Sequence, residues 1–366
     1  MTRRVIMIAA GGTGGHLFPA FALTEELKRR GFEVDLVTDV RADQYGIDFP
    51  GRGVHQVPSA TLRGRSPLAV LKLALTLAQG IWRARALLKE TNPSVIVGFG
   101  GYPTVPPLIA AKLKDVPIVI HEANAVMGRA NRLLARFASS IALTFEKTKY
   151  FRSDDQSKKR IAGMPVRDVV LEERTPYQAR ATADAFSLLV FGGSQGARVF
   201  ADNVPAALKE LPQEYRAKLK LVQQVREEDM ERVRAAYSEA GIEAELAEFF
   251  PDLPHRMANA HLVIGRSGAS TVAELTVLGR PAILVPLPHA LDNDQLENAT
   301  RLQEVGGAWC IEQDAFTPER LRDEIMHLAD SPDVLAGAAE AALALGEPQA
   351  VARLADVIEE LARMRD

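Results

Sequence analysis

Short apolar runs of four to six residues alternate along the chain with longer segments in which apolar residues recur at helical spacing. Runs of this length, bounded by turn residues, predict buried strands, and strands that alternate with helices predict parallel sheets. We therefore expect an α/β protein. Its predicted strands cover residues 5–10, 33–38, 94–98, 117–121 and 140–144 in the first half, and residues 187–191, 219–223, 244–247, 261–264, 282–285 and 308–311 in the second.

Proline and glycine positions predict where several helices begin and end. Pro19 suits the first turn of a helix, and Thr317 followed by Pro318 predicts a capped helix start. Glycine often ends a helix because it adopts the left-handed conformation without strain. Helix ends are accordingly expected at Gly31, Gly279 and Gly306.

Two breaks in the pattern indicate how the chain is organised. At 366 residues the chain is long for one domain, so two domains are expected. The polar stretch 152–160 predicts a surface loop, and the Gly-Met-Pro sequence at 163–165 predicts an interdomain joint. A second break at 346–348 precedes the last predicted helix, 350–365, which we expect to cross back and pack on the first domain.

Composition narrows the class of protein. The chain is 47% hydrophobic, as expected of a globular protein with buried cores, and its net charge of −3 gives no whole-chain argument for nucleic-acid binding. The single cysteine, Cys310, cannot form an internal disulfide, which favours a reducing compartment, and its apolar neighbours favour a buried hydrophobe over a nucleophile. No signal peptide or run of about 18 apolar residues is visible, so a cytosolic protein that can still touch a membrane is predicted.

Two glycine-rich turns, one in each half, each lie between a predicted strand and a predicted helix. They read GGTGGH at 11–16 and GGSQGA at 192–197. Such a turn combines free backbone N–H groups with the positive end of a helix dipole, which favours phosphate. His16 could act as a general base or merely cap its loop, and Ser194 with Arg198 could bind phosphate or belong to a purely structural turn.

Other polar segments follow predicted strands in both halves. Glu274 could accept hydrogen bonds from ribose hydroxyls, or complete a capping box with Thr271. Residues 289–295 suit sugar hydroxyls, because ligands of open α/β sheets bind beyond the carboxyl ends of the strands, but they also suit an ordinary helix start. Residues 100–102 and 121–124 occupy the same topological place in the first half.

The stretch from Arg63 to Lys89 combines an apolar helical pattern with cations and Trp82. It could dock on an anionic bilayer, or form a buried core helix with an exposed basic end. Metal binding has little support, because the seven histidines show no paired spacing typical of metal ligands.

Taken in order, seven segments resemble the family of bacterial peptidoglycan glycosyltransferases, a branch of glycosyltransferase family 28. They are GGTGGH at 11–16, GGY at 100–102, HEAN at 121–124, GMPVR at 163–167, GGSQGA at 192–197, RSGASTVAE at 266–274 and DNDQLENA at 292–299. The resemblance implies a GT-B fold, with two Rossmann-like domains whose parallel sheets face a deep interdomain cleft. Residues 1–164 would face the acceptor and the membrane, residues 165–346 would bind the donor, and residues 347–366 would pack back on the first domain.

The family's reaction moves N-acetylglucosamine (GlcNAc) from UDP-GlcNAc to the 4-hydroxyl of N-acetylmuramic acid (MurNAc) in lipid I, undecaprenyl-pyrophosphoryl-MurNAc-pentapeptide. The product is lipid II, formed with inversion during cell-wall synthesis. Transferases of this fold hold the leaving diphosphate with backbone amides and helix dipoles, so neither a catalytic metal nor a cofactor is implied. A lipid acceptor implies a peripheral protein on the cytoplasmic face of the inner membrane, with the Arg63-to-Lys89 stretch as the candidate contact. The resemblance also leaves open an association with other cell-wall synthesis proteins.

The matching motifs also imply roles for individual residues. His16 is the candidate base, with Glu122 and Tyr102 close by. The implied substrate contacts are Thr13, Gly14, Gly15, Asn124, Arg167, Ser194, Gln195, Gly196, Phe250, Ala269, Ser270, Glu274, Asp294 and Gln295.

Two positions depart from the family pattern. Gln is common in the family where this chain has Ala123, and Asn where it has Met164, which leaves the fine geometry of those loops open. A UDP-GlcNAc 2-epimerase of the same architecture and a non-catalytic nucleotide-sugar-binding protein remain the alternatives.

Overall fold

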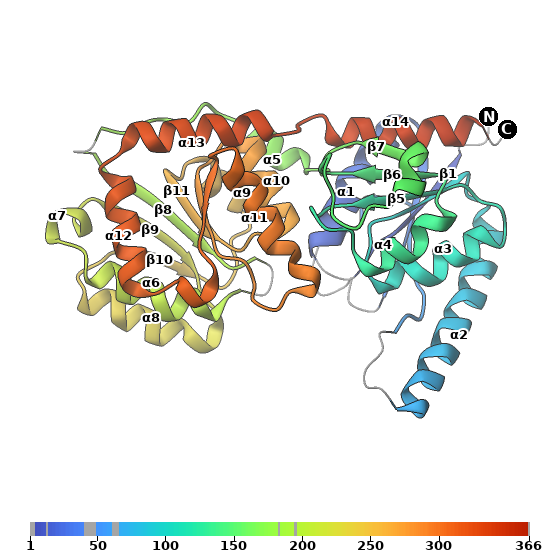
Figure 1. The fold of residues 1–366 in the computed structure, drawn as a ribbon, viewed down its shortest axis with the longest axis horizontal. Coiled ribbons are helices and arrows are strands. Elements are labelled where there is room, and N and C mark those ends of the chain that lie inside the picture. The colour runs from blue at the N-terminus through green and yellow to red at the C-terminus, as the bar shows by residue number, and fades with distance from the viewer. Residues whose placement is uncertain are drawn as a thin grey trace. The chain divides into compact units, whose positions relative to one another are not determined.

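The chain forms two compact units, seen in the ribbon of the computed structural model in Figure 1. The structure describes residues 4–11, 14–39, 49–60, 66–181, 184–193 and 196–364. Unit 1 comprises Met1–Arg167 together with Pro348–Asp366, and unit 2 comprises Asp168–Glu347. We assign the two expected domains to these units.

Unit 1 is built on a parallel sheet of order β3-β2-β1-β4-β5-β6-β7. Its register places Ile8 of β1 opposite Leu36 of β2 on one side and Val97 of β4 on the other. The strands are β1 (Val5–Ala9), β2 (Glu33–Thr38), β3 (Gly53–Gln56), β4 (Val95–Gly98), β5 (Ile118–Glu122), β6 (Ser140–Leu143) and β7 (Lys159–Ile161).

Helices cover both faces of this sheet and bury a separate core on each. One core gathers α1 (Gly14–Arg29) and α14 (Ala350–Arg363), and the other gathers α2 (Pro67–Thr91), α3 (Val105–Lys112) and α4 (Arg129–Leu134). The last helix therefore packs against α1, where Arg30 also binds the Asp356 carboxylate at 2.6 Å.

Unit 2 repeats the design with a parallel sheet of order β10-β9-β8-β11-β12-β13. The strands are β8 (Phe186–Phe191), β9 (Leu219–Gln224), β10 (Ala244–Ala247), β11 (Leu262–Gly265), β12 (Ala282–Leu284) and β13 (Ala308–Cys310). The helices are α5 (Asp168–Glu172), α6 (Arg198–Lys209), α7 (Gln213–Arg216), α8 (Glu227–Glu239), α9 (Leu253–Ala258), α10 (Ala269–Leu278), α11 (Asp294–Glu304), α12 (Pro318–Ala329) and α13 (Pro332–Leu345).

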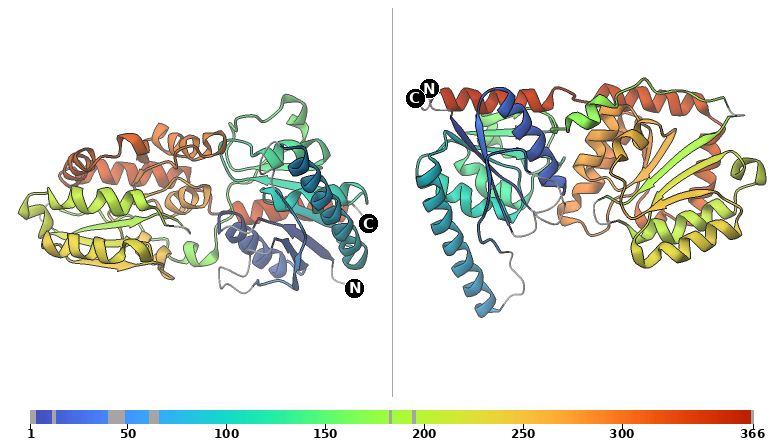
Figure 2. Two further views of the ribbon diagram at one scale, coloured as in Figure 1. Left: turned by 90° about the horizontal axis from the view of Figure 1, so that it is seen from below. Right: turned by 180° about the vertical axis from the view of Figure 1, so that it is seen from behind.

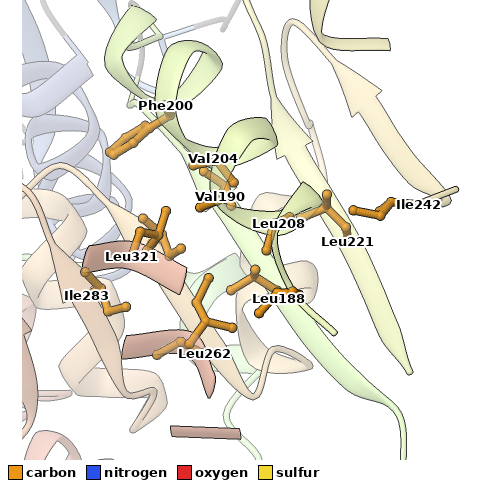
Figure 3. Packing of buried hydrophobic residues seen from close by; sticks show 14 of the residues in the cluster. Leu188, Val190, Phe200, Val204, Leu208, Leu221, Ile242, Leu262, Ile283 and Leu321 are labelled. Carbon is orange, nitrogen blue, oxygen red and sulfur yellow. The ribbon is translucent and has the colours of Figure 1, made fainter. Parts of the chain in front are cut away.

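The core of unit 2 lies between its sheet and a layer of helices that includes α6, α8 and α12. Figure 3 shows this packing, in which Leu188 and Val190 of β8 meet side chains of α6. The other labelled members are Phe200, Val204, Leu208, Leu221, Ile242, Leu262, Ile283 and Leu321.

The alternation of apolar runs and helical segments predicted the sheets well. Every predicted strand is present, with ends shifted by no more than one residue, and Gly31, Gly279 and Gly306 adopt positive φ just beyond helices. The Thr317 side chain accepts a hydrogen bond from the Arg320 N–H, which confirms the predicted cap. Strands β3 and β7 were not predicted, because both are edge strands with polar, partly exposed sequences.

Two local predictions are wrong. Pro19 is the sixth residue of α1 rather than part of its first turn, because the helix already begins at Gly14. Residues 152–160 are not a simple loop: they contain a 3₁₀ helix, Ser153–Lys158, and the start of β7. Asp155 is buried there and binds Lys158 at 3.1 Å, so charge in this stretch does not imply full exposure.

Helix α2 is attached to unit 1 through only one end. Its buried residues are Gly80, Ala84 and Leu88, and a Cβ at Gly80 would collide with the Pro58 carbonyl oxygen. The amino-terminal half of the helix extends away from the sheet of unit 1, as both Figure 1 and the right-hand view of Figure 2 show. A buried core helix, one of the two readings of this sequence, is therefore wrong for that half.

Candidate functional site

Each sheet has a switch point where strand order reverses direction. In unit 1 this lies between β1 and β4, and in unit 2 between β8 and β11. Ligands of open α/β sheets bind in the crevice beyond the carboxyl ends of such a strand pair. The segments leaving these four strands are residues 11–16 and 100–102 in unit 1, and residues 192–197 and 266–270 in unit 2. The strongest sequence motifs thus fall where the topology places ligands.

His16 is the third residue of α1, and its ring lies against three glycines of unit 1. A Cβ on Gly11 would lie 3.4 Å from His16 Nδ1, and Cβ atoms on Gly100 and Gly101 would lie 3.7 Å from Nε2 and Cε1. Gly100 and Gly101 have φ of +85° and +76°, values that L side chains rarely adopt. Gly100 and Gly101 are therefore required by the backbone of the turn after β4, which runs in contact with the imidazole at the switch point.

Tyr102 and Arg167 belong to two later segments of unit 1 that approach the start of α1. Tyr102 follows Gly101 at the start of a 3₁₀ helix and is 37% exposed. Arg167 places its guanidinium 4.3 Å from the ring centre of Phe18, which is on α1 two residues beyond His16. Both are thus on elements that adjoin the amino-terminal end of α1, where Gly14 and Gly15 also lie.

Glu122 is buried at the end of β5 and organises the loop that follows it. One carboxylate oxygen accepts hydrogen bonds from the Asn124 N–H and side-chain amide, at 3.0 and 3.2 Å. The other accepts from the Gly128 N–H and from Asn131 Nδ2, both at 2.8 Å. Burial raises the pKa of this carboxyl, and the four N–H donors oppose that rise. The arrangement makes Glu122 the anchor of Asn124.

Asn131 was not identified from the sequence, although it links the loop held by Glu122 to the glycines beside His16. Its amide nitrogen binds Glu122, and the same amide lies 3.5 Å from where a Cβ on Gly100 would stand, beside the His16 ring. It is the third residue of α4 and buried. No sequence spacing connects Asn131 to the HEAN motif at 121–124, so its role is visible only in the folded structure.

His121 precedes Glu122 and is completely buried, with Nε2 2.9 Å from the Gly163 carbonyl oxygen. Burial lowers its pKa to about 4, and the hydrogen bond to the carbonyl opposes this shift. The imidazole is therefore neutral in the folded protein at neutral pH and joins β5 to the Gly163 turn.

We expect this histidine to make unit 1 less stable in acid. Above pH 6.5 it is neutral in both folded and unfolded chains, but between about pH 6.5 and 4 only the unfolded chain binds the proton. The free energy of unfolding should thus fall by about 2 to 3 kcal/mol between pH 7 and 4.5 on account of this group. Denaturant titrations of the wild type and His121→Gln should show a shallower pH dependence in the variant, and equal slopes would contradict the assignment.

In unit 2 the glycine turn after β8 leads into α6, whose N-cap is Ala197. Gly193 and Gly196 have φ of +82° and +64°, so the turn depends on glycine at both places. Gln224, at the end of β9, binds the N–H of Gly192, a contact that sequence reasoning did not anticipate.

The segment after β11 begins α10 at Ala269 with Gly268 as N-cap. The capping box proposed for Thr271 and Glu274 is therefore wrong, because both lie inside the helix. Ser270 and Glu274 are one turn apart on the same face, and Ser270 Oγ is buried with no hydrogen-bond partner among the described residues. A buried hydroxyl of this kind suits a ligand contact.

Hydrogen bonds tie this segment to α11. Ser267 Oγ donates to the Gln295 carbonyl at 2.7 Å, and the buried Asn298 donates to the Ser267 carbonyl at 3.1 Å. Gln295 Oε1 accepts from the Leu287 N–H, and Asp294 accepts from the Gln295 N–H. Burial raises the pKa of Asp294. Ala269, Ser270, Asp294 and Gln295 are thus held on two helices joined at their amino-terminal ends.

Phe250 lies in the loop between β10 and α9, with its ring buried. The Arg256 guanidinium stands 4.4 Å from the ring centre and makes two bonds of 2.7 Å to the Glu245 carboxylate. The ring is therefore an anchor, which leaves the loop backbone to meet a ligand.

Three predicted site residues, Thr13, Ser194 and Gln195, lie outside the described residues. Within the described part of the chain, no group of three or more His, Cys, Asp or Glu side chains could hold a metal ion. Cys310 is half-buried rather than fully buried as predicted, and burial raises the pKa of its thiol to about 11, which disfavours the thiolate.

Comparison with known proteins defines the class. The glycosyltransferase family 28 N-terminal domain matches residues 6–143, and the family's C-terminal domain matches residues 187–360. The chain belongs to glycosyltransferase family 28.

The relatives of the chain narrow the kind of glycosyltransferase further. It is 49% identical over 365 residues to the UDP-N-acetylglucosamine–N-acetylmuramyl-(pentapeptide) pyrophosphoryl-undecaprenol N-acetylglucosamine transferase of Chelativorans sp., covering 99% of this chain and 96% of the relative. The transferase of the same name from Nitrobacter hamburgensis is 50% identical, with 99% and 98% covered. The crystal structure of Acinetobacter baumannii MurG superposes with a TM-score of 0.79 at 28% identity, covering 98% of this chain and 99% of that one. A putative UDP-N-acetylglucosamine 2-epimerase from Listeria monocytogenes, with TM-score 0.70 and 15% identity, shares the fold alone.

Proposed function

We propose that this protein transfers GlcNAc from UDP-GlcNAc to the 4-hydroxyl of MurNAc in lipid I, giving lipid II and UDP in peptidoglycan synthesis. The observation that carries the proposal is near-full-length identity of 49–50% to transferases named for this reaction. The two switch points also support it. The one in unit 1 carries a candidate base, His16, and the one in unit 2 carries a glycine-rich turn that suits an anion.

In this mechanism His16 of unit 1 removes the proton from the acceptor hydroxyl. The hydroxyl oxygen then attacks the anomeric carbon of GlcNAc, and the bond from that carbon to UDP breaks with inversion. Unit 2 holds the donor: the turn 192–196 and the start of α6 stabilise the charge that develops on the diphosphate. Glu274 binds the ribose, the backbone at Phe250 binds uracil, and Asp294 with Gln295 binds the sugar hydroxyls. Asn124 and Arg167 complete the donor contacts, and residues 13–15 lie near the phosphates.

The direct test is release of UDP from UDP-GlcNAc by the purified protein with and without a lipid I analogue. We expect release only with the acceptor, together with a β-linked disaccharide product. Turnover of UDP-GlcNAc without acceptor would identify an epimerase instead, and binding without any turnover would identify a non-catalytic nucleotide-sugar-binding protein.

A lipid acceptor requires access to a bilayer surface, and α2 provides the candidate contact. Leu68, Leu71, Leu75 and Trp82 are 76%, 55%, 63% and 72% exposed. At about 100° per residue these side chains share a stripe about 60° wide, roughly opposite the buried residues of the helix. Lys72, Arg83 and Arg85 flank the stripe and are exposed. Among the described helices none is long and apolar enough to cross a membrane. We place this stripe on the cytoplasmic face of the inner membrane.

Replacing both Leu75 and Trp82 with alanine should weaken binding to vesicles containing anionic lipid by about tenfold or more, because two apolar side chains no longer enter the interface. Vesicle co-sedimentation measures this directly. Leu343→Ala, which removes a side chain 43% exposed on unit 2, is the matched control. Equal binding by the double variant and the control would refute this contact.

A further inference from the structure

Gln224 lies at a position in unit 2 that reaches two strand exits at once. It is the last residue of β9, which is hydrogen-bonded to β8 on one side and to β10 on the other. The glycine turn leaves β8, and the loop that contains Glu248 and Phe250 leaves β10. A side chain at the end of the middle strand can therefore contact both segments.

The side chain uses its amide for three hydrogen bonds to backbone. Oε1 accepts from the Gly192 N–H at 2.9 Å, while Nε2 donates to the Gly193 carbonyl at 3.1 Å and to the Glu248 carbonyl at 3.0 Å. The orientation of the amide is fixed, because one neighbour is a donor and two are acceptors. Both N–H groups of the amide are thereby used.

Each of the two segments that Gln224 joins is also held in place by another side chain. Arg226 donates to the Gly196 carbonyl at 3.3 Å, and its side chain packs where a Cβ on Gly196 would stand. On the other side, the buried Phe250 ring lies under Arg256. The Gln224 amide sets the separation between these anchored segments.

We propose that Gln224 is a positioning residue for the donor nucleotide. By fixing the distance between the turn 192–193 and the backbone at Glu248, it lets UDP engage the diphosphate and uracil contacts simultaneously. The inference rests on the proposed function, which assigns these two segments to the two ends of UDP. Gln224 itself acts through the backbone and makes no contact with the reacting atoms.

The test compares the binding of uridine and UDP to the wild type, Gln224→Ala and Gln224→Glu. Uridine uses the uracil and ribose contacts and has no diphosphate for the glycine turn, whereas UDP needs the turn and the uracil contact at the correct separation. We expect the Kd for UDP to rise about tenfold, the effect of losing roughly one well-formed hydrogen bond, and the Kd for uridine to rise no more than about threefold. The Kd for uridine divided by the Kd for UDP should therefore fall. Glutamate should be at least as harmful as alanine, since its carboxylate would face the Gly193 and Glu248 carbonyl oxygens.

Kinetics provide a second measurement. The KM for UDP-GlcNAc should rise about tenfold, with kcat and the KM for the lipid acceptor within about threefold of wild type. Gln303→Ala is the matched control. The side chain of Gln303 also accepts a backbone hydrogen bond, from the Cys310 N–H, but Cys310 lies in β13, the edge strand farthest from β10.

A lower melting temperature with an unchanged ratio of the uridine and UDP constants would overturn the proposal and leave a structural role only. An unchanged Kd for UDP in both Gln224 variants would also overturn it. If wild type binds UDP but transfers no GlcNAc to lipid I, the proposed function fails while the binding test of Gln224 still stands.

Discussion

Replacing His16 with alanine should lower kcat by about a hundredfold to ten-thousandfold, the usual contribution of a positioned general base. The ring stands at the switch point of unit 1 against Gly11, Gly100 and Gly101, so the substitution removes the imidazole from the place where the topology predicts a ligand. The substitution leaves the donor contacts of unit 2, and those of Asn124 and Arg167, in place, and the KM for UDP-GlcNAc should therefore stay within about threefold of wild type. Steady-state kinetics with a lipid I analogue measure both quantities.

The control for this variant is His327→Ala, which removes an exposed histidine from α12 of unit 2. It should have wild-type kinetics. A His16→Ala enzyme whose kcat stays within about threefold of wild type would exclude His16 as the base. A large rise in KM with unchanged kcat would instead make it a binding residue.

Replacing Glu122 with glutamine should be almost as damaging, despite the identical shape of the two side chains. Each carboxylate oxygen accepts two N–H groups, so either orientation of the new amide would place its NH₂ against two donors. We expect the free energy of unfolding to fall by about 3 kcal/mol, as buried donors lose their acceptors. Displacement of the Asn124 loop should also lower kcat/KM by about a hundredfold.

Thermal or denaturant unfolding, together with kinetics, tests this prediction. Glu146→Gln makes the same chemical change at an exposed position of unit 1 and should alter neither measurement. Normal stability in Glu122→Gln would mean that the four donors do not depend on a carboxylate. Normal stability with low activity would assign Glu122 a direct role in the reaction.

The periodic pattern predicted the sheets because parallel strands buried on both faces read as continuous apolar runs. Edge strands β3 and β7 lack that signal, since one side of each faces no neighbouring strand and their sequences are polar. The start of α1 was misplaced because proline is common in the first turn of a helix, whereas Pro19 lies inside this helix. The local sequence does not distinguish these two positions of proline.

The candidate site was predictable where a motif directly follows a strand, as at residues 11–16, 100–102 and 266–270. Asn131 and Gln224 were not identified, because each acts on a segment distant in sequence and neither has a spacing signature. Gln224 becomes meaningful only once β9 is known to lie between β8 and β10. Glu274 shows the opposite error, since local spacing matched a cap that the actual helix start at Ala269 rules out.

The return of α14 to unit 1 has a consequence for the newly made chain. Leu354, Ala355, Ile358 and Ala362 belong to the core shared with α1, but they are synthesised after all of unit 2. Domains generally fold as units during synthesis, usually in order from the amino terminus. Unit 1, although its synthesis begins first, keeps an apolar face uncovered until its last helix is available. The newly made chain thus exposes apolar surface of unit 1 throughout the synthesis of unit 2, which makes it a natural client for chaperones.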